Sequence, residues 1–181
     1  MWRKARVGMA LLVMTLGSAG SLEAQVESWQ AVQVEDIRTM KEKFRGLAEA
    51  FDEGQYDWRP MEGVRSVRDV LALAIAEAHL FPTGWGYDTP PGSAAGFRAE
   101  MERAGALSKA EILADLDTSF DFLIGVVEGM SEAERMSDGE YFGRPMPVHA
   151  SVATAMNDMH EHLGQLIAYA RTNEVVPPWS R

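Results

Sequence analysis

The sequence contains no cysteine and few basic residues for its number of acidic ones. The absence of cysteine excludes disulfides, cysteine-ligated zinc and thiol nucleophiles. Lys and Arg number 17 against 27 Asp and Glu, and the net charge of −10 would repel a phosphate backbone, so nucleic acid is a poor candidate partner. At 181 residues, 46% hydrophobic and 24% charged, the chain has the composition of one folded domain.

Residues 1–24 have the pattern of a secretory signal peptide. Three basic residues within 3–6 precede an apolar run over 7–16 that is too short to span a bilayer, and small residues follow. We expect cleavage at the end of this segment or a few residues earlier; an uncleaved anchor is the competing interpretation. The sequence therefore predicts an exported protein, periplasmic or extracellular, with one domain over 25–181 and no stable membrane insertion after cleavage.

Four segments have hydrophobic residues at alternating spacings of three and four, which is typical of the apolar stripe of an amphipathic helix. The segments span about residues 32–52, 66–82, 108–129 and 152–173. Ser66 and Ser108 begin capping boxes, the usual start signal of a helix. We find no convincing strand pattern. Four such helices in one domain predict an all-α fold, a four-helix bundle.

Two connections, at 82–97 and 132–148, are rich in Gly, Pro, Asp and Ser and are predicted to be loops. One short helix is expected at 98–104. Both connections are longer than usual, and long loops in a compact bundle are often binding rims.

The sequence has no HExxH motif and no phosphate-binding glycine-rich loop, so its chemistry has to come from four histidines and nearby carboxylates. Asp158 and His162 are four residues apart and share a helix face, joined further along by Gln165 and Tyr169. Such a pair can hold a metal or orient a general base, and it can equally be a structural or solvated pair. His160 faces away from His162, so these two histidines are not expected to bind one ion.

For the remaining candidate residues, structural roles are at least as well supported as functional ones. His79 is expected near the end of its helix as a dipole partner or a buried, hydrogen-bonded residue, and His149 as a cap of the last helix. Trp58 stands in a loop, where it either lines a pocket with Gln165 and Tyr169 or seals one end of the bundle.

Five short motifs occur in an order that resembles the DinB/YfiT-like family. They lie at 58–60 (WRP), 65–67 (RSV), 162–165 (HLGQ), 169–171 (YAR) and 176–179 (VPPW). The resemblance covers nearly the whole chain after the predicted leader. It implies an up-down-down-up bundle, frequent homodimers and commonly a divalent metal held by three histidines, one on the second helix and two on the fourth.

The sequence departs from that ligand pattern at two of the three positions. His162 matches the last histidine, but Asp158 stands at the first position of the pair and Leu73 at the position on the second helix. Aspartate is a known ligand of zinc and manganese, whereas leucine has no donor atom. Glu77, one turn after Leu73, is a candidate substitute. The candidate ligands of a divalent ion (Zn, Ni or Mn) are therefore Glu77, Asp158 and His162.

Two functions fit these residues. We favour an exported module for a small-molecule ligand or another partner, with a degraded metal site, because it explains Leu73 and Asp158 without further assumptions. The alternative is a divalent-metal-dependent hydrolase or transferase that uses the substituted site. The family resemblance also implies relatives that include transferases and isomerases using low-molecular-weight thiols. Such thiols are cytosolic, which argues against thiol chemistry in an exported protein. Convergence of Glu77, Asp158 and His162 on a common point would favour the enzyme.

Overall fold

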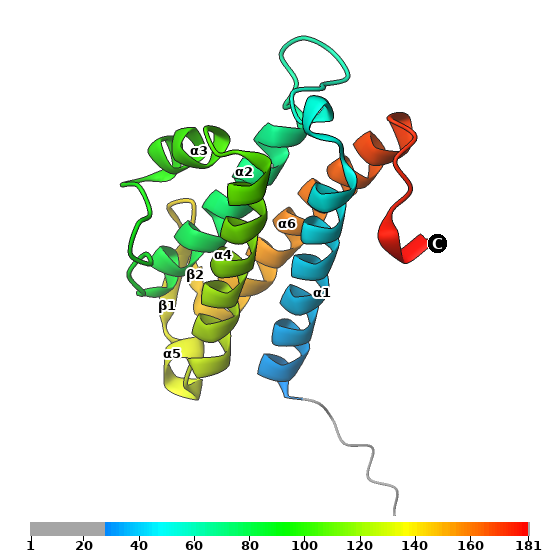
Figure 1. Ribbon diagram of the computed structural model, residues 1–181. Coiled ribbons are helices and arrows are strands. Elements are labelled where there is room, and N and C mark those ends of the chain that lie inside the picture. The colour runs from blue at the N-terminus through cyan, green and yellow to red at the C-terminus, as the bar shows by residue number, and fades with distance from the viewer. Residues whose placement is uncertain (1–27, 181) are drawn as a thin grey trace, which may run out of the picture.

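In the computed structural model, which describes residues 28–180, four long helices form a bundle (Figure 1). They are α1 (Trp29–Ala50), α2 (Val67–Leu80), α4 (Lys109–Gly129) and α6 (Val148–Thr172). In Figure 1, α1 runs upward, α2 and α4 run downward and α6 runs upward, which agrees with the direction pattern that the family resemblance implied. The predicted leader at 1–24 lies outside the described residues.

The long helices are joined by shorter elements. These are α3 (Phe97–Gly105), α5 (Glu132–Met136), β1 (Asp138–Tyr141), β2 (Arg144–Pro147) and the 3-10 segments η1 (Glu53–Gln55), η2 (Phe81–Trp85) and η3 (Pro178–Ser180). Helix α3 is the short helix that the sequence predicted. The absence of strands was a wrong prediction, because β1 and β2 form an antiparallel hairpin within the segment 132–148. Both strands are short and β2 contains two prolines, so the strand signal is weak.

The capping boxes form as the sequence predicted. The Ser66 hydroxyl accepts the Asp69 amide at 3.1 Å, and the Asp69 carboxylate accepts the Ser66 amide at 2.8 Å. The Ser108 hydroxyl and the Glu111 carboxylate make the same reciprocal pair at the start of α4. These bonds satisfy amides that have no partner inside the helix, and they fix where α2 and α4 begin.

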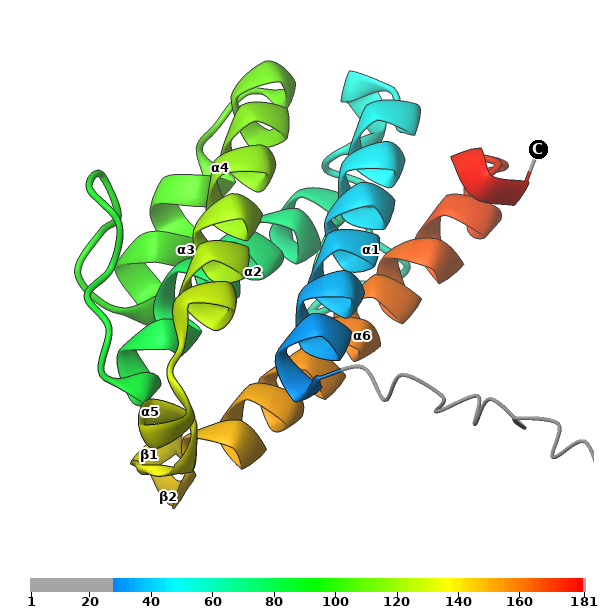
Figure 2. The same ribbon diagram turned by 90° about the horizontal axis from the view of Figure 1, so that it is seen from below.

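The packing gives α2 a central place. Helices α4 and α6 each pack against both α1 and α2, and α3 packs against α2 as well (Figure 2). As a result, every residue of α2 from Val70 to His79 is buried. The sequence predicted one apolar stripe for this helix, but a helix that is covered on all sides buries its polar residues too. This is why Glu77 and His79 lie inside the protein.

Two glycines allow the hairpin to lie directly against η2. A Cβ atom at Gly84 would come within 2.6 Å of the Glu140 carbonyl oxygen, and one at Gly139 would come within 2.9 Å of the Gly84 carbonyl oxygen. Any other residue at these positions would push the two segments apart. The close approach brings the tip of the hairpin toward η2 and α3, next to the buried end of α2.

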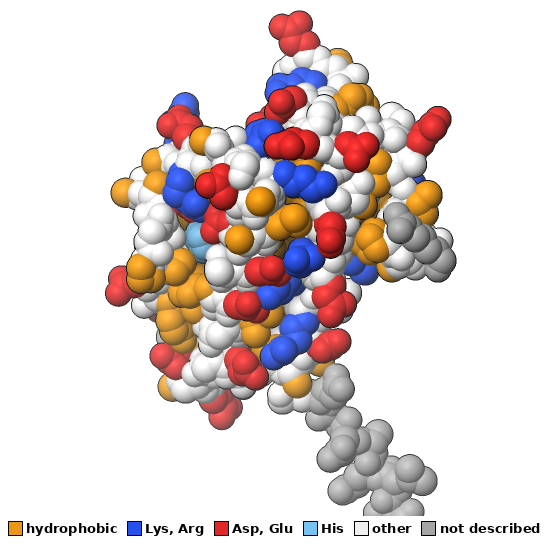
Figure 3. Space-filling model, viewed as in Figure 1, with side chains coloured by type: hydrophobic (Ala, Val, Ile, Leu, Met, Phe, Trp, Pro, Cys, Tyr) orange, Lys and Arg blue, Asp and Glu red, His pale blue; other side chains and the backbone are white. Residues whose placement is uncertain are grey.

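The outer surface of α1 and α4 carries mixed charges. Basic and acidic side chains alternate there (Figure 3), with Lys41 paired to Asp121 at 2.7 Å and Arg45 to Asp117 at 3.0 Å. Exposed pairs of this kind contribute little to stability, about 0–1 kcal/mol each. Within residues 28–180, no helix is both long and apolar enough to cross a membrane.

Candidate metal centre

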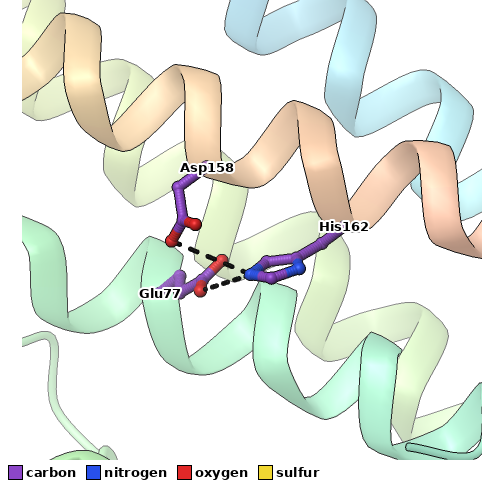
Figure 4. Close-up of side chains that lie close together, drawn as sticks. All are labelled: Glu77, Asp158 and His162. Carbon is purple, nitrogen blue, oxygen red and sulfur yellow. Dashed lines mark ion pairs between the residues drawn. The ribbon is translucent and has the colours of Figure 1, made fainter.

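Glu77, Asp158 and His162 come together between α2 and α6. The Nε2 atom of His162 lies 3.1 Å from Oε1 of Glu77 and 3.7 Å from Oδ2 of Asp158. Figure 4 shows both carboxylates directed toward the same imidazole. The four-residue spacing on α6 sets the Asp158–His162 pair, and the packing of α2 against α6 adds Glu77.

Glu77 is held in an unfavourable environment. The residue is 1% exposed, and its Oε2 atom is buried without a hydrogen-bond partner among the described residues. Burial raises the pKa of Glu77 to about 7, although the hydrogen bond with His162 acts in the opposite direction. The negative charge of Asp158 raises the pKa further. A buried carboxylate oxygen without a partner is costly, so this side chain is well suited to accept a cation.

The charges of Glu77 and Asp158 also raise the pKa values of two neighbouring groups, His162 and Tyr141. Burial alone would lower the pKa of His162, but the hydrogen bond with Glu77 and the charges of Glu77 and Asp158 outweigh it and raise that pKa. The pKa of the Tyr141 hydroxyl is raised by burial and then by Asp158. The two carboxylates therefore produce a negative electrostatic potential at His162 and Tyr141.

The donor set fits a divalent cation. One donor atom from each of Glu77, Asp158 and His162 lies within 4.8 Å of the others. Two carboxylates and one imidazole are ligands that zinc accepts, and manganese tolerates the same mixture. Leu73, one turn before Glu77, is buried and offers no donor atom. The structure thus gathers the three residues that the sequence selected as candidate ligands.

The other candidates lie in separate places. Gln165 donates a hydrogen bond to the Tyr169 hydroxyl at 2.7 Å, which donates to the Arg65 carbonyl at 3.0 Å. The Trp58 ring packs edge-on against Tyr169, with centroids 5.3 Å apart. These contacts tie the segment before α2 to the end of α6. A role of these three residues in lining a pocket stays a prediction.

The remaining histidines each bind a different partner. Nδ1 of His79 lies 2.8 Å from Glu100, so His79 is the buried, hydrogen-bonded residue that the sequence suggested. His149 lies in the first turn of α6, with Nδ1 3.3 Å from the Arg135 carbonyl. His160 pairs with Asp36 of α1 near the surface, at 2.9 Å, and points away from His162 as expected.

A cavity of about 190 Å³ adjoins the cluster, and sequence reasoning missed most of its walls. Its lining residues come from α2, η2, the start of α3 and the residue before it, the hairpin and α6: Glu77, Leu80, Phe81, Thr83, Gly84, Gly96, Phe97, Glu140, Tyr141, Phe142 and Ser151. Glu77 belongs to both the cavity wall and the carboxylate cluster. The expectation that the two long connections form a binding rim was the signal that pointed here, but it named no residue.

Comparison with known proteins identifies the family. The family model described as the DinB superfamily matches residues 36–166. The chain belongs to the DinB superfamily. This confirms the family that the sequence motifs resembled. A comparison with curated protein sequences gives no match.

Solved structures share the DinB bundle. A DinB-like protein from Bacillus cereus has a TM-score of 0.68 at 14% identity, covering 83% of this chain and 98% of its own. YfiT from Bacillus subtilis, described as a probable metal-dependent hydrolase, has a TM-score of 0.62 at 13% identity, with coverages of 94% and 97%. The mycothiol-dependent maleylpyruvate isomerase has a TM-score of 0.57 at 17% identity and covers 76% of this chain but only 60% of its own. At such identities the likeness shows the fold alone.

Proposed function

We propose that this DinB protein binds a divalent cation through Glu77, Asp158 and His162 and presents it to a small ligand in the adjacent cavity. The observation that carries the proposal is the buried Oε2 atom of Glu77, which lacks a partner among the described residues although its neighbours are a histidine and a second carboxylate. A bound cation would remove this deficit and would balance the two negative charges at once.

When bound, such a cation polarises an oxygen atom of a ligand or lowers the pKa of a bound water. The protein's own residues supply the rest of the site. Glu77 borders the cavity and would orient the cation toward it, while the aromatic part of the wall would shield a bound ligand from water. Tyr141 offers a hydroxyl group beside Asp158 at the hairpin side.

In this proposal, binding of the cation and a small ligand is the favoured function, and hydrolysis is the second candidate. Leu73 leaves the site with a single imidazole, which is the departure that favours a module with a reduced metal site. Hydrolysis is supported by the position of Glu77, since a ligand in the cavity lies next to the cation ligands. YfiT, described as a probable metal-dependent hydrolase, has the same fold but supports a reaction only by analogy. Export and pairing of two copies stay predictions.

The test is zinc and manganese binding to the metal-stripped protein, measured by isothermal titration calorimetry. We expect one site, and we expect His162→Ala to weaken zinc binding by more than about 100-fold, because even changes outside the ligand shell cost about 10–100-fold. His160→Ala is the matched control, since His160 lies two residues away on the same helix and pairs with Asp36 instead. Equal zinc affinity in the two variants would overturn the proposal.

A further inference from the structure

Phe142 occupies a backbone position that does not suit it. It is the first residue of the two-residue turn between β1 and β2, with φ of 46°, and Gly143 follows with φ of 75°. Turns of this kind favour Asn-Gly, because a side chain with a Cβ atom loses free energy at positive φ. Phe142 is also 63% exposed, so burial does not compensate for the strained backbone. Neither local conformation nor core packing explains a phenylalanine here.

The Phe142 ring has a clear set of neighbours. Its centroid lies 5.6 Å from that of Phe81, 5.9 Å from that of Phe97 and 4.8 Å from that of Tyr141, all in edge-to-face arrangements. These rings come from η2, α3 and β1, and all of them line the cavity. Phe142 therefore completes an aromatic wall on the outer side, opposite the buried end of α2.

The size and polarity of the cavity define what it can hold. Its volume is about 190 Å³, and a dry cavity of about 150 Å³ is known to hold benzene. Aromatic rings in edge-to-face geometry recognise another ring well, since ring edges and faces carry opposite partial charges. The polar side chains in the wall include Thr83, Glu140 and Ser151 as well as Glu77. Among these, Glu77 has a buried side-chain oxygen, Oε2, without a partner among the described residues.

We propose that this cavity binds a small molecule with one aromatic ring and an oxygen-bearing head group, with the ring against Phe81, Phe97 and Phe142 and the head group toward Glu77. The proposal has two halves, binding of the ring (the ring half) and binding of the head group (the head-group half). The ring half depends only on the cavity. The head-group half rests on the proposed cation, because two carboxylates without a cation would repel an oxygen anion. The strained position of Phe142 is then retained because the ring serves ligand binding.

The ring half is tested with toluene, which has no head group, added to the zinc-free protein and followed by two-dimensional NMR. We expect saturable shifts in η2, α3 and the hairpin. The decisive variant is Phe142→Asn, because asparagine suits the turn and lacks the ring. We expect it to weaken toluene binding at least tenfold while the denaturation midpoint stays the same or rises.

Two further variants complete this test. Phe142→Tyr should retain binding, and Met136→Asn, at another exposed apolar residue outside the cavity wall, should leave it unchanged. The proposal is overturned if the wild type shows no saturable shifts, if Phe142→Asn binds toluene as well as the wild type does, or if that variant lowers the denaturation midpoint as loss of a core residue would.

The head-group half is tested with benzoate in the presence and absence of zinc. We expect zinc to tighten benzoate binding at least tenfold and to leave toluene binding unchanged. If zinc binds but benzoate affinity does not respond, the head-group half is wrong. If zinc does not bind at all, the proposed function fails, and toluene binding still decides the ring half separately.

Discussion

Two buried carboxylates, each paired with a histidine, lie on different sides of α2 and differ in how many hydrogen bonds they receive. On one side His79 bonds Glu100 of α3, which also accepts the Ala94 amide at 2.6 Å and two bonds from Arg103 at 2.6 and 2.9 Å. On the other side Glu77 pairs with His162, and its second carboxylate oxygen has no hydrogen-bond partner within residues 28–180. Glu100 is 0% exposed and Glu77 is 1% exposed, so direct contact with solvent does not distinguish them, although Glu77 lies deeper in the protein.

The difference appears in the pKa values. Burial tends to raise the pKa of Glu100, but the bonds from Arg103, the Ala94 amide and His79 outweigh it and lower that pKa to about 2. Burial, which fewer donors oppose here, raises the pKa of Glu77 to about 7. A fully bonded buried carboxylate stabilises the fold, here by holding α3 and the segment before it against α2. A carboxylate that lacks donors costs stability, and such positions are typical of binding sites.

The largest effect is expected from Glu100→Gln. The amide removes one of the two charges that balance Arg103, leaving Asp115 as the other, and places an NH₂ group where the bonded donors require an acceptor. We expect a loss of about 3–4 kcal/mol in the free energy of unfolding, measured by urea denaturation. Glu102→Gln, an exposed position on the same helix, is the matched control and should change stability by less than about 0.5 kcal/mol. Similar losses in both variants would contradict a structural role for the Glu100 network.

The two carboxylates should also give opposite pH dependences. Because the folded-state pKa of Glu100 is lowered to about 2, its stabilisation is complete above the unfolded value of 4.5 and is lost as the pH falls toward 2. That loss amounts to about 3 kcal/mol. Because the folded-state pKa of Glu77 is raised to about 7, the native state holds its proton longer, and stability declines as the pH rises from 4.5 through 7.

Urea titrations of the metal-stripped protein between pH 2 and pH 8 measure both windows. Glu100→Gln should reduce the loss of stability in acid and leave the decline toward neutral pH unchanged, and Glu77→Gln should reduce only the decline toward neutral pH. A single variant that abolished both windows would show that the two pairs are coupled through α2 and are not independent.

Most of the bundle could be predicted from the sequence because the patterns that specify its helices involve residues close together in the chain. The three-and-four spacing and the Ser66 and Ser108 caps depend on residues within a few positions of one another, and all four long helices follow from them. The hairpin could not be predicted in this way. Its turn begins with Phe142 instead of asparagine, and its place against η2 depends on Gly84, which is distant in sequence.

The candidate site, too, could be predicted only where its residues lie close together in the sequence. Asp158 and His162 share one helix, so their pairing follows from a four-residue spacing. Glu77 was reached only through the position of Leu73 in the family pattern. The Glu100 network and the part of Tyr141 in the site depend on how α3 and the hairpin pack against α2, and no spacing along the chain encodes that packing.

The smallest stability effect is expected from Glu77→Gln in the metal-stripped protein, and it separates the two pairs most sharply. The amide oxygen can still accept the bond from His162, and the cost of a buried charge with too few hydrogen bonds disappears. This gain is partly offset because the amide NH₂ group is buried where Oε2 of Glu77 has no partner among the described residues. We therefore expect the free energy of unfolding at pH 8 to change by about 1 kcal/mol or less, with a gain more consistent with the structure than a loss. The same substitution should abolish tight zinc binding in calorimetry, since an amide is a poor zinc ligand. A loss as large as that of Glu100→Gln would mean that Glu77 serves the fold, and the contrast between the two sides of α2 would then fail.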